Sequence, residues 1–102
     1  MSRNLLSIRH LKADDIRDLI KTAQDFKKQV TAGKPMQDVP RRTVGLLFFE
    51  ASTRTRVSFE QAAHYLGYNI SVFAAQSSSL SKGETLKDTV LTLKGERIEA
   101  LV

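Results

Sequence analysis

The feature that most constrains the fold is a continuously apolar run that leads straight into a cluster of hydroxyl and guanidinium side chains. The run covers residues 43–49 and consists of Thr-Val-Gly-Leu-Leu-Phe-Phe. Such a run without alternation is typical of a strand that is covered on both faces, as in a parallel sheet. An amphipathic helix is expected to begin near Thr53 and to end where Gly67 allows a left-handed turn after Leu66.

A longer amphipathic helix is expected at residues 13–30. Asp14 and Asp15 would be favourable in its first turn, at the positive end of the helix dipole. Gly33 and Pro35 break the pattern after its end. The apolar residues that recur at helical spacing are Ile16, Leu19, Ile20, Ala23, Phe26 and Val30.

Two further strands and one further helix complete the expected order. Residues 68–75 and 98–102 are rich in β-forming side chains and predict the strands. Ser81 and Glu84 stand three apart before an apolar-periodic run, which predicts a capping-box start for a helix that Gly95 would end. After the first helix the order is β-α-β-α-β. This order is typical of an α/β protein with a doubly wound parallel sheet.

The composition limits the compartment and the bonding chemistry. The chain has 102 residues and no cysteine, which excludes disulfides and thiolate metal sites and fits a cytoplasmic protein. His10 and His64 are isolated in the sequence, so no metal site is expected. No apolar run approaches the length needed to cross a bilayer, and no membrane partner is expected.

The basic balance favours small anions as ligands. Sixteen basic and eleven acidic residues give a net charge of +5. The basic residues do not form a continuous stripe, and there is no tryptophan on which bases would stack, so we do not expect nucleic acid as a partner. A nucleic-acid binder is the lowest-ranked alternative, and it predicts a steep loss of affinity with salt.

The turn after the first strand has the chemistry of a phosphate pocket. The first N–H groups of a helix lack intrahelical acceptors, and the helix dipole adds positive charge at the same point. Ser52, Thr53 and Thr55 add hydroxyl donors. Arg54 and Arg56 add planar guanidinium groups that suit phosphate oxygens.

A second polar loop, residues 76–82, follows the second strand and contains several serines and Lys82. Ligands of open parallel sheets bind beyond the carboxyl ends of the strands, so both loops are expected to converge on one dianion. Structural alternatives remain at the first loop. Ser52 and Thr53 would also serve as helix caps alone. We expect Arg56 to pair with Glu60 one turn further on.

Two residues later in the same helix, Ser58 and Phe59, are expected to pack it against the sheet.

The residues of the first loop resemble a known signature. Residues 52–56, Ser-Thr-Arg-Thr-Arg, followed by Ser58-Phe59-Glu60 and Leu66-Gly67, are similar to the carbamoyl-phosphate motif of the aspartate and ornithine carbamoyltransferases. A second block at residues 77–89, Ser-Ser-Ser-Leu-Ser-Lys-Gly-Glu-Thr-Leu-Lys-Asp-Thr, resembles the aspartate branch. The resemblance extends from Leu5 to the end of the chain, and family members are several times longer.

The resemblance implies roles for individual residues. The residues that match the phosphate-binding positions are Ser52, Thr53, Arg54 and Thr55, with Thr55 also reaching toward the carbamoyl oxygen. Lys82 and Ser79 match residues of the second loop, with Ser78 as an alternative to Ser79. That loop serves the site of a neighbouring subunit in the aspartate branch. The catalytic set would be Arg54, Thr55 and Lys82. Glu50 resembles a residue tied to domain closure.

The implied activity is carbamoyl transfer from carbamoyl phosphate to the amine of L-aspartate, a step of pyrimidine biosynthesis, with no cofactor. Residues 1–102 would form a single, incomplete carbamoyl-phosphate-binding domain from the amino-terminal portion of such an enzyme. The resemblance also implies a homotrimer with shared sites, and it leaves a regulatory chain or a dihydroorotase-type partner open. The alternatives are an ornithine carbamoyltransferase-type enzyme and a non-catalytic anion-binding or subunit-interaction module.

Overall fold

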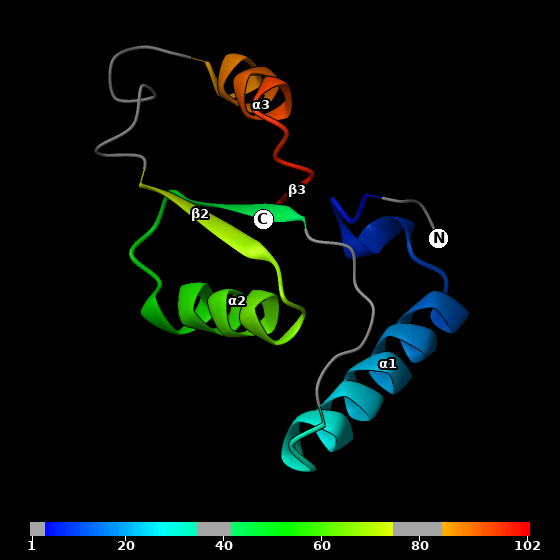
Figure 1. Cartoon of the computed structure of the whole chain (residues 1–102). Helices are drawn as coiled ribbons and strands as arrows, with labels where there is room; N and C mark the ends of the chain where they lie inside the picture. The colour runs from blue at the N-terminus through cyan, green and yellow to red at the C-terminus, as the bar shows by residue number, and fades with distance from the viewer. Residues whose placement is uncertain (1–3, 35–41, 75–84) are drawn as a thin grey trace. The chain divides into compact units, whose positions relative to one another are not determined.

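The computed structural model describes residues 4–34, 42–74 and 85–102. The chain divides into two compact units, Met1–Pro35 and Met36–Val102. The order expected from the sequence, a helix followed by β-α-β-α-β, is confirmed (Figure 1). The elements are η1 (Ile8–His10), α1 (Ala13–Thr31), β1 (Thr43–Phe48), α2 (Thr53–Tyr65), β2 (Asn69–Ala74), α3 (Leu86–Gly95) and β3 (Ala100–Leu101).

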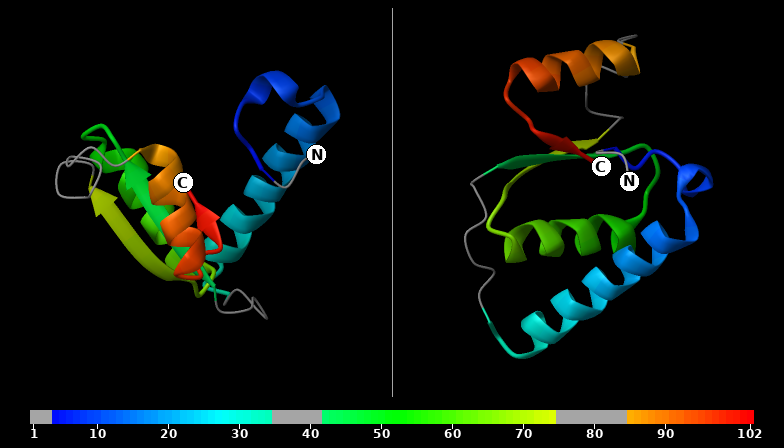
Figure 2. Two further views of the ribbon diagram at one scale, coloured as in Figure 1. Left: turned by 90° about the horizontal axis from the view of Figure 1, so that it is seen from above. Right: turned by 90° about the vertical axis from the view of Figure 1, so that its right-hand side faces the viewer.

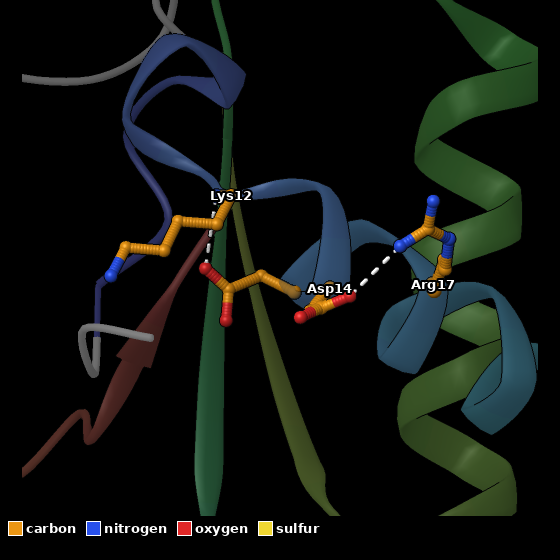
Figure 3. A network of polar contacts seen from close by, with 4 residues as sticks. Lys12, Asp14 and Arg17 are labelled. Carbon is orange, nitrogen blue, oxygen red and sulfur yellow. Dashed lines mark hydrogen bonds and ion pairs between the residues drawn. The ribbon is translucent and has the colours of Figure 1, made fainter.

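In the first unit, acidic side chains stabilise the start of α1. The backbone N–H of Lys12 donates to Asp15 Oδ2 at 3.0 Å, which satisfies one amide at the helix entrance (Figure 3). Asp14 pairs with Arg17 one turn on, with 2.8 Å between Oδ1 and Nη1. Both carboxylates also lie at the positive end of the helix dipole. The predicted role of Asp14 and Asp15 in the first turn is therefore confirmed.

Gly33 ends α1 as expected. It adopts a left-handed backbone with φ of 66°. Its N–H donates to Val30 O at 3.1 Å, and the N–H of Lys34 donates to Gln29 O at 3.0 Å. This pair of bonds is the Schellman motif, which satisfies carbonyls that the end of a helix leaves unpaired.

The second unit is built on a parallel sheet with the strand order β2-β1-β3. β1 lies in the centre, and its residues 44–46 are buried, in agreement with the continuously apolar pattern. Helices α2 and α3 lie on opposite faces of the sheet, as expected for a doubly wound arrangement (Figure 2). The core is formed by Val44, Leu46, Ala63 and Leu93.

The predicted strand ends differ slightly from those observed. β2 is Asn69–Ala74, so it begins one residue later than predicted, and residue 75 lies outside the described residues. β3 contains only Ala100–Leu101 of the predicted 98–102. Hydrogen bonds to β1 nevertheless flank that strand, from Glu99 N to Thr43 O at 3.1 Å and from Val102 N to Gly45 O at 2.9 Å. The pairing therefore extends past the regular strand.

The third helix ends where predicted, but it begins at a cap that the sequence did not predict. Ser81 and Glu84 lie outside the described residues, and the N-cap is Thr85, whose hydroxyl accepts from Asp88 N at 3.1 Å. Gly95 is the last residue of the helix, as predicted. The left-handed residue is Arg97, with φ of 63°.

The bonds that follow α3 explain this position. Arg97 N donates to Lys94 O at 3.1 Å, and Ile98 N donates to Leu93 O at 3.0 Å. They form the same Schellman motif that Gly33 forms after α1, and the motif requires its left-handed residue two positions beyond the last helical one.

Candidate anion-binding site

A short turn connects β1 to α2 and places the start of the helix at the carboxyl edge of the sheet (Figure 1). Within it, the N–H of Ser52 donates to Glu50 O at 2.9 Å, which closes a tight turn around Ala51. Ser52 is the N-cap residue, and its carbonyl accepts from Arg56 N at 3.1 Å. The turn thus fixes the direction in which the first amides of α2 point.

The amino end of α2 has no cap from its own side chains. Ser52, the N-cap residue, makes no side-chain hydrogen bond to the helix, and the first turn contains no acidic residue. The interpretation of Ser52 as a cap alone is therefore wrong. The early N–H groups of a helix have no intrahelical acceptors and lie at the positive end of the dipole, so this end is left open to an external anion.

The side chains of the motif lie together on this first turn. Thr53, Arg54 and Thr55 are exposed and Ser52 is partly buried. Within the part of the chain that the structure describes, no carboxylate pairs with Arg54.

The second arginine of the motif is engaged elsewhere. The predicted pairing of Arg56 is confirmed, since its Nε lies 3.6 Å from Glu60 Oε1. Arg54 is therefore the guanidinium of the motif that is left for a ligand.

The expected packing of Ser58 against the sheet is wrong. Ser58 is exposed, and its Oγ donates to Arg54 O at 2.8 Å on its own helix. Phe59 keeps 43% of its surface exposed. The buried residue of α2 is Ala63, with 4% exposed. The hydroxyl of Ser58 thus finds its acceptor on its own helix rather than in the core.

The second predicted loop begins at the same edge. Phe48 and Ala74, the last residues of β1 and β2, are paired Cα partners, so the two strands end side by side. Residues 75–84 lie outside the described residues, and the roles of Ser78, Ser79 and Lys82 therefore stay predictions. Glu50 is exposed in the first loop, and its expected part in domain closure also stays a prediction.

An ion pair that was not predicted from the sequence lies at the opposite edge of the sheet. Arg42 Nε lies 3.4 Å from Glu99 Oε2 and joins the start of β1 to the approach of β3. No sequence pattern predicts it, because it depends on the register of two strands that are distant along the chain. The ion pair lies at the start of β1, whereas the anion site follows the end of that strand, so the two are separate. His10 and His64 are both exposed.

Nothing in the described ranges forms a cluster of three or more histidine or acidic residues that would hold a metal ion. Within the same ranges, no helix is both long and apolar enough to cross a membrane.

Residues 3–102 match the family described as aspartate/ornithine carbamoyltransferase, carbamoyl-P binding domain. The chain belongs to this family. It is 48% identical to an aspartate carbamoyltransferase catalytic subunit from a Nocardioides species, over 100% of this chain and 32% of the relative. It is 43% identical to the subunit of the same name from Christiangramia forsetii, over 97% of this chain and 32% of the relative.

Solved structures of the family share the fold. Ornithine carbamoyltransferase from Pyrococcus furiosus superposes with a TM-score of 0.85 at 36% identity, over 97% of this chain and 31% of that one. Aspartate transcarbamoylase from Trypanosoma cruzi, in complex with carbamoyl aspartate and phosphate, gives 0.81 at 36% identity, over 93% and 30%. The chain thus spans about a third of the length of the carbamoyltransferases that it matches. The fold is common to both branches of the family and does not separate them.

Proposed function

We propose that this chain is the carbamoyl-phosphate-binding part of an aspartate carbamoyltransferase. The observation that carries the proposal is the uncapped amino end of α2, where the first turn bears Arg54 without a carboxylate partner among the described residues. An anion at this point would receive backbone N–H donors, hydroxyl donors and a planar cation together. The family match of residues 3–102 supports carbamoyl phosphate as that anion.

The proposed chemistry follows from the charges of the substrates. The neutral amine of L-aspartate attacks the carbamoyl carbon, the bond from that carbon to the phosphate oxygen breaks, and the proton that the nitrogen loses leaves with the phosphate. Arg54 and Lys82 offset the negative charge that builds on the departing phosphate, while the Thr55 hydroxyl donates to the carbamoyl oxygen. Ser52, Thr53 and Ser79 help to hold the phosphate, and holding both substrates together supplies a further part of the rate. The mechanism needs no covalent enzyme intermediate.

The choice of acceptor amino acid rests on the relatives and on the second loop. Eight of the relatives, 39–48% identical, are aspartate carbamoyltransferase catalytic subunits. Lys82 and the serines before it also resemble the aspartate branch. The alternative is transfer to ornithine. The similarity to ornithine carbamoyltransferase from Pyrococcus furiosus favours that alternative. Assays of carbamoyl transfer by the protein as it is made in the cell, with L-aspartate and with ornithine as the acceptor, distinguish the two activities.

We extend the proposal to the assembly and its location. The loop that contains Ser79 and Lys82 would serve the site of a neighbouring copy in a cytoplasmic homotrimer, and Glu50 would take part in domain closure. A regulatory chain or a dihydroorotase-type partner is compatible with this arrangement.

Anion binding is tested by amide NMR of this chain during titration with carbamoyl phosphate and, separately, with inorganic phosphate. We expect saturable shifts at residues 52–55. Arg54→Ala should weaken binding by roughly 10- to 100-fold, because hydrogen bonds between charged partners contribute most to such sites. Arg17→Ala is the matched control, since Arg17 lies in the first unit and pairs with Asp14.

Two results would count against the proposed site. The first is the absence of any shift at residues 52–55 in a chain that gives a dispersed spectrum. The second is an equal loss of affinity in both arginine variants, which would indicate a general effect of charge. Binding without transfer activity in the protein as the cell makes it would favour the non-catalytic anion-binding module.

A further inference from the structure

The hydroxyl of Ser58 has an acceptor that does not serve the stability of its helix. Ser58 Oγ donates to the carbonyl of Arg54, four residues earlier, at 2.8 Å, although the side chain is exposed and has access to water. A bond of this kind slightly destabilises a helix and tends to bend it. Alanine at the same position would be the better helix former. Since the bond does not stabilise the helix, we look for its consequence at the group that accepts it, the Arg54 carbonyl.

That carbonyl shares a planar peptide unit with the N–H of Thr55. In a trans peptide the C=O and the N–H point in opposite directions, so fixing one fixes the other. Thr55 is the third residue of α2, and its N–H is one of those without an intrahelical acceptor. The backbone N–H of Ser58 donates to the Arg54 carbonyl in an α-helix, and the Ser58 hydroxyl is a second donor to it. The hydroxyl therefore helps to hold the direction of an amide that points out of the amino end of the helix.

The same bond also changes the strength of that donor. Hydrogen bonds in a chain polarise one another, and a donor bound to the C=O of a peptide unit strengthens the N–H of the same unit. From this geometry we infer that Ser58 is a positioning residue for the anion, which it serves by aiming and polarising the Thr55 amide. The inference rests on the proposed function, because it needs an anion at the start of α2.

The third helix offers an instructive contrast. Thr89 Oγ1 donates to Thr85 O at 3.2 Å, which is the same spacing of four residues. Thr89, however, is only 8% exposed, so its hydroxyl needs a partner inside the protein. The amino end of α3 is also closed by the Thr85 side chain, which accepts from Asp88 N. Burial explains the bond in α3 but not the bond of the exposed Ser58 in α2.

The test compares Ser58→Ala with the unaltered chain, using inorganic phosphate as the probe. We expect an equal or higher free energy of unfolding in urea, together with roughly two- to fivefold weaker phosphate binding, since one charge-assisted donor is weakened and none is lost. The shift of the Thr55 amide proton on binding should shrink, while that of Thr53 stays. Ser58→Thr should restore the phosphate affinity and the Thr55 shift, because a threonine hydroxyl forms the same bond in a helix.

Ala62→Gly is the matched control for helix stability. Ala62 is exposed on the same helix, and glycine there weakens α2 without touching the bond from Ser58 to Arg54. We expect this variant to lose stability and, measured on its folded fraction, to keep its phosphate affinity. A merely structural role for Ser58 would instead make affinity follow stability in every variant.

The outcomes separate this inference from the proposed function. If the unaltered chain gives no phosphate response at residues 52–55, both fail together. If it binds phosphate and Ser58→Ala binds equally well with an unchanged Thr55 shift, the inference alone is overturned. Should Ser58→Ala fail to fold, a weakened Thr55 response in Ser58→Thr would overturn it as well.

Discussion

Gly45 in the central strand lies directly against Leu101 in the neighbouring strand. A Cβ atom at Gly45 would be 2.7 Å from Leu101 Cδ2 and 3.1 Å from Ile98 Cγ2. Contacts this short require a neighbour to move, and Ile98 is a β-branched side chain with little rotamer freedom. The glycine in the middle of the apolar run therefore allows β3 and the segment before it to approach β1.

Gly45→Ala should consequently destabilise the fold. We expect a loss of about 1–2 kcal/mol in the free energy of unfolding, measured by urea denaturation, because an inserted methyl group overpacks the site. Gly95→Ala is the control, since no atom lies within 4 Å of a Cβ there. At the end of α3 it should stabilise by about 0.5–1 kcal/mol. A stabilised Gly45→Ala variant would contradict the close packing of β3.

Arg97 should be replaceable by glycine with a gain in stability. Its backbone is left-handed with φ of 63°, where a side chain is strained and glycine is not. We expect Arg97→Gly to raise the free energy of unfolding by about 0.5–1 kcal/mol, the greater freedom of glycine in the unfolded chain offsetting part of the relief. Gly67→Ala, at the equivalent position after α2, should lower it. Changes of the same sign in both variants would refute this account of the helix ends.

A carboxylate at residue 52 should stabilise the helix and abolish the anion site. Ser52→Asp supplies the missing cap and a negative charge at the positive end of α2, together worth about 1 kcal/mol. The same charge repels phosphate, so phosphate shifts at residues 53–55 should disappear. Ser52→Asn caps without charge and should retain weak binding. Equal binding by the two variants in NMR titrations would mean that the anion lies elsewhere.

Much of the second unit could be predicted from the sequence, because its signals are local. The apolar run at 43–49 predicted a covered strand, and Gly67 predicted the end of α2. The end of α3 at Gly95 was predicted too, but the left-handed conformation of Arg97 after it was not, since an arginine does not indicate such a conformation in the sequence. The ion pair of Arg42 and Glu99 was missed, because it depends on strand register.

The site was predictable to the extent that it is built from one segment. Residues 52–55 lie on a single turn, so their proximity follows directly from the helix. Whether Ser52 caps that helix does not follow from its identity, since the same hydroxyl suits both roles. The absence of a hydrogen bond from the helix to its side chain decides the question. The bond from Ser58 to Arg54 likewise depends on a rotamer that the sequence does not specify.

Shared sites between subunits can be tested with two inactive variants. In the protein as the cell makes it, Arg54→Ala and Lys82→Ala should each abolish most carbamoyl transfer. If Lys82 serves the site of a neighbouring copy, mixed trimers contain some sites with both residues intact. An intact site needs a Lys82→Ala chain, which supplies Arg54, beside an Arg54→Ala chain, which supplies Lys82. Random mixing in equal amounts should then restore about a quarter of the unaltered activity. The double variant mixed with either single variant is the control and should restore none. An absence of recovery after subunit exchange has been verified would mean that each chain completes its own site.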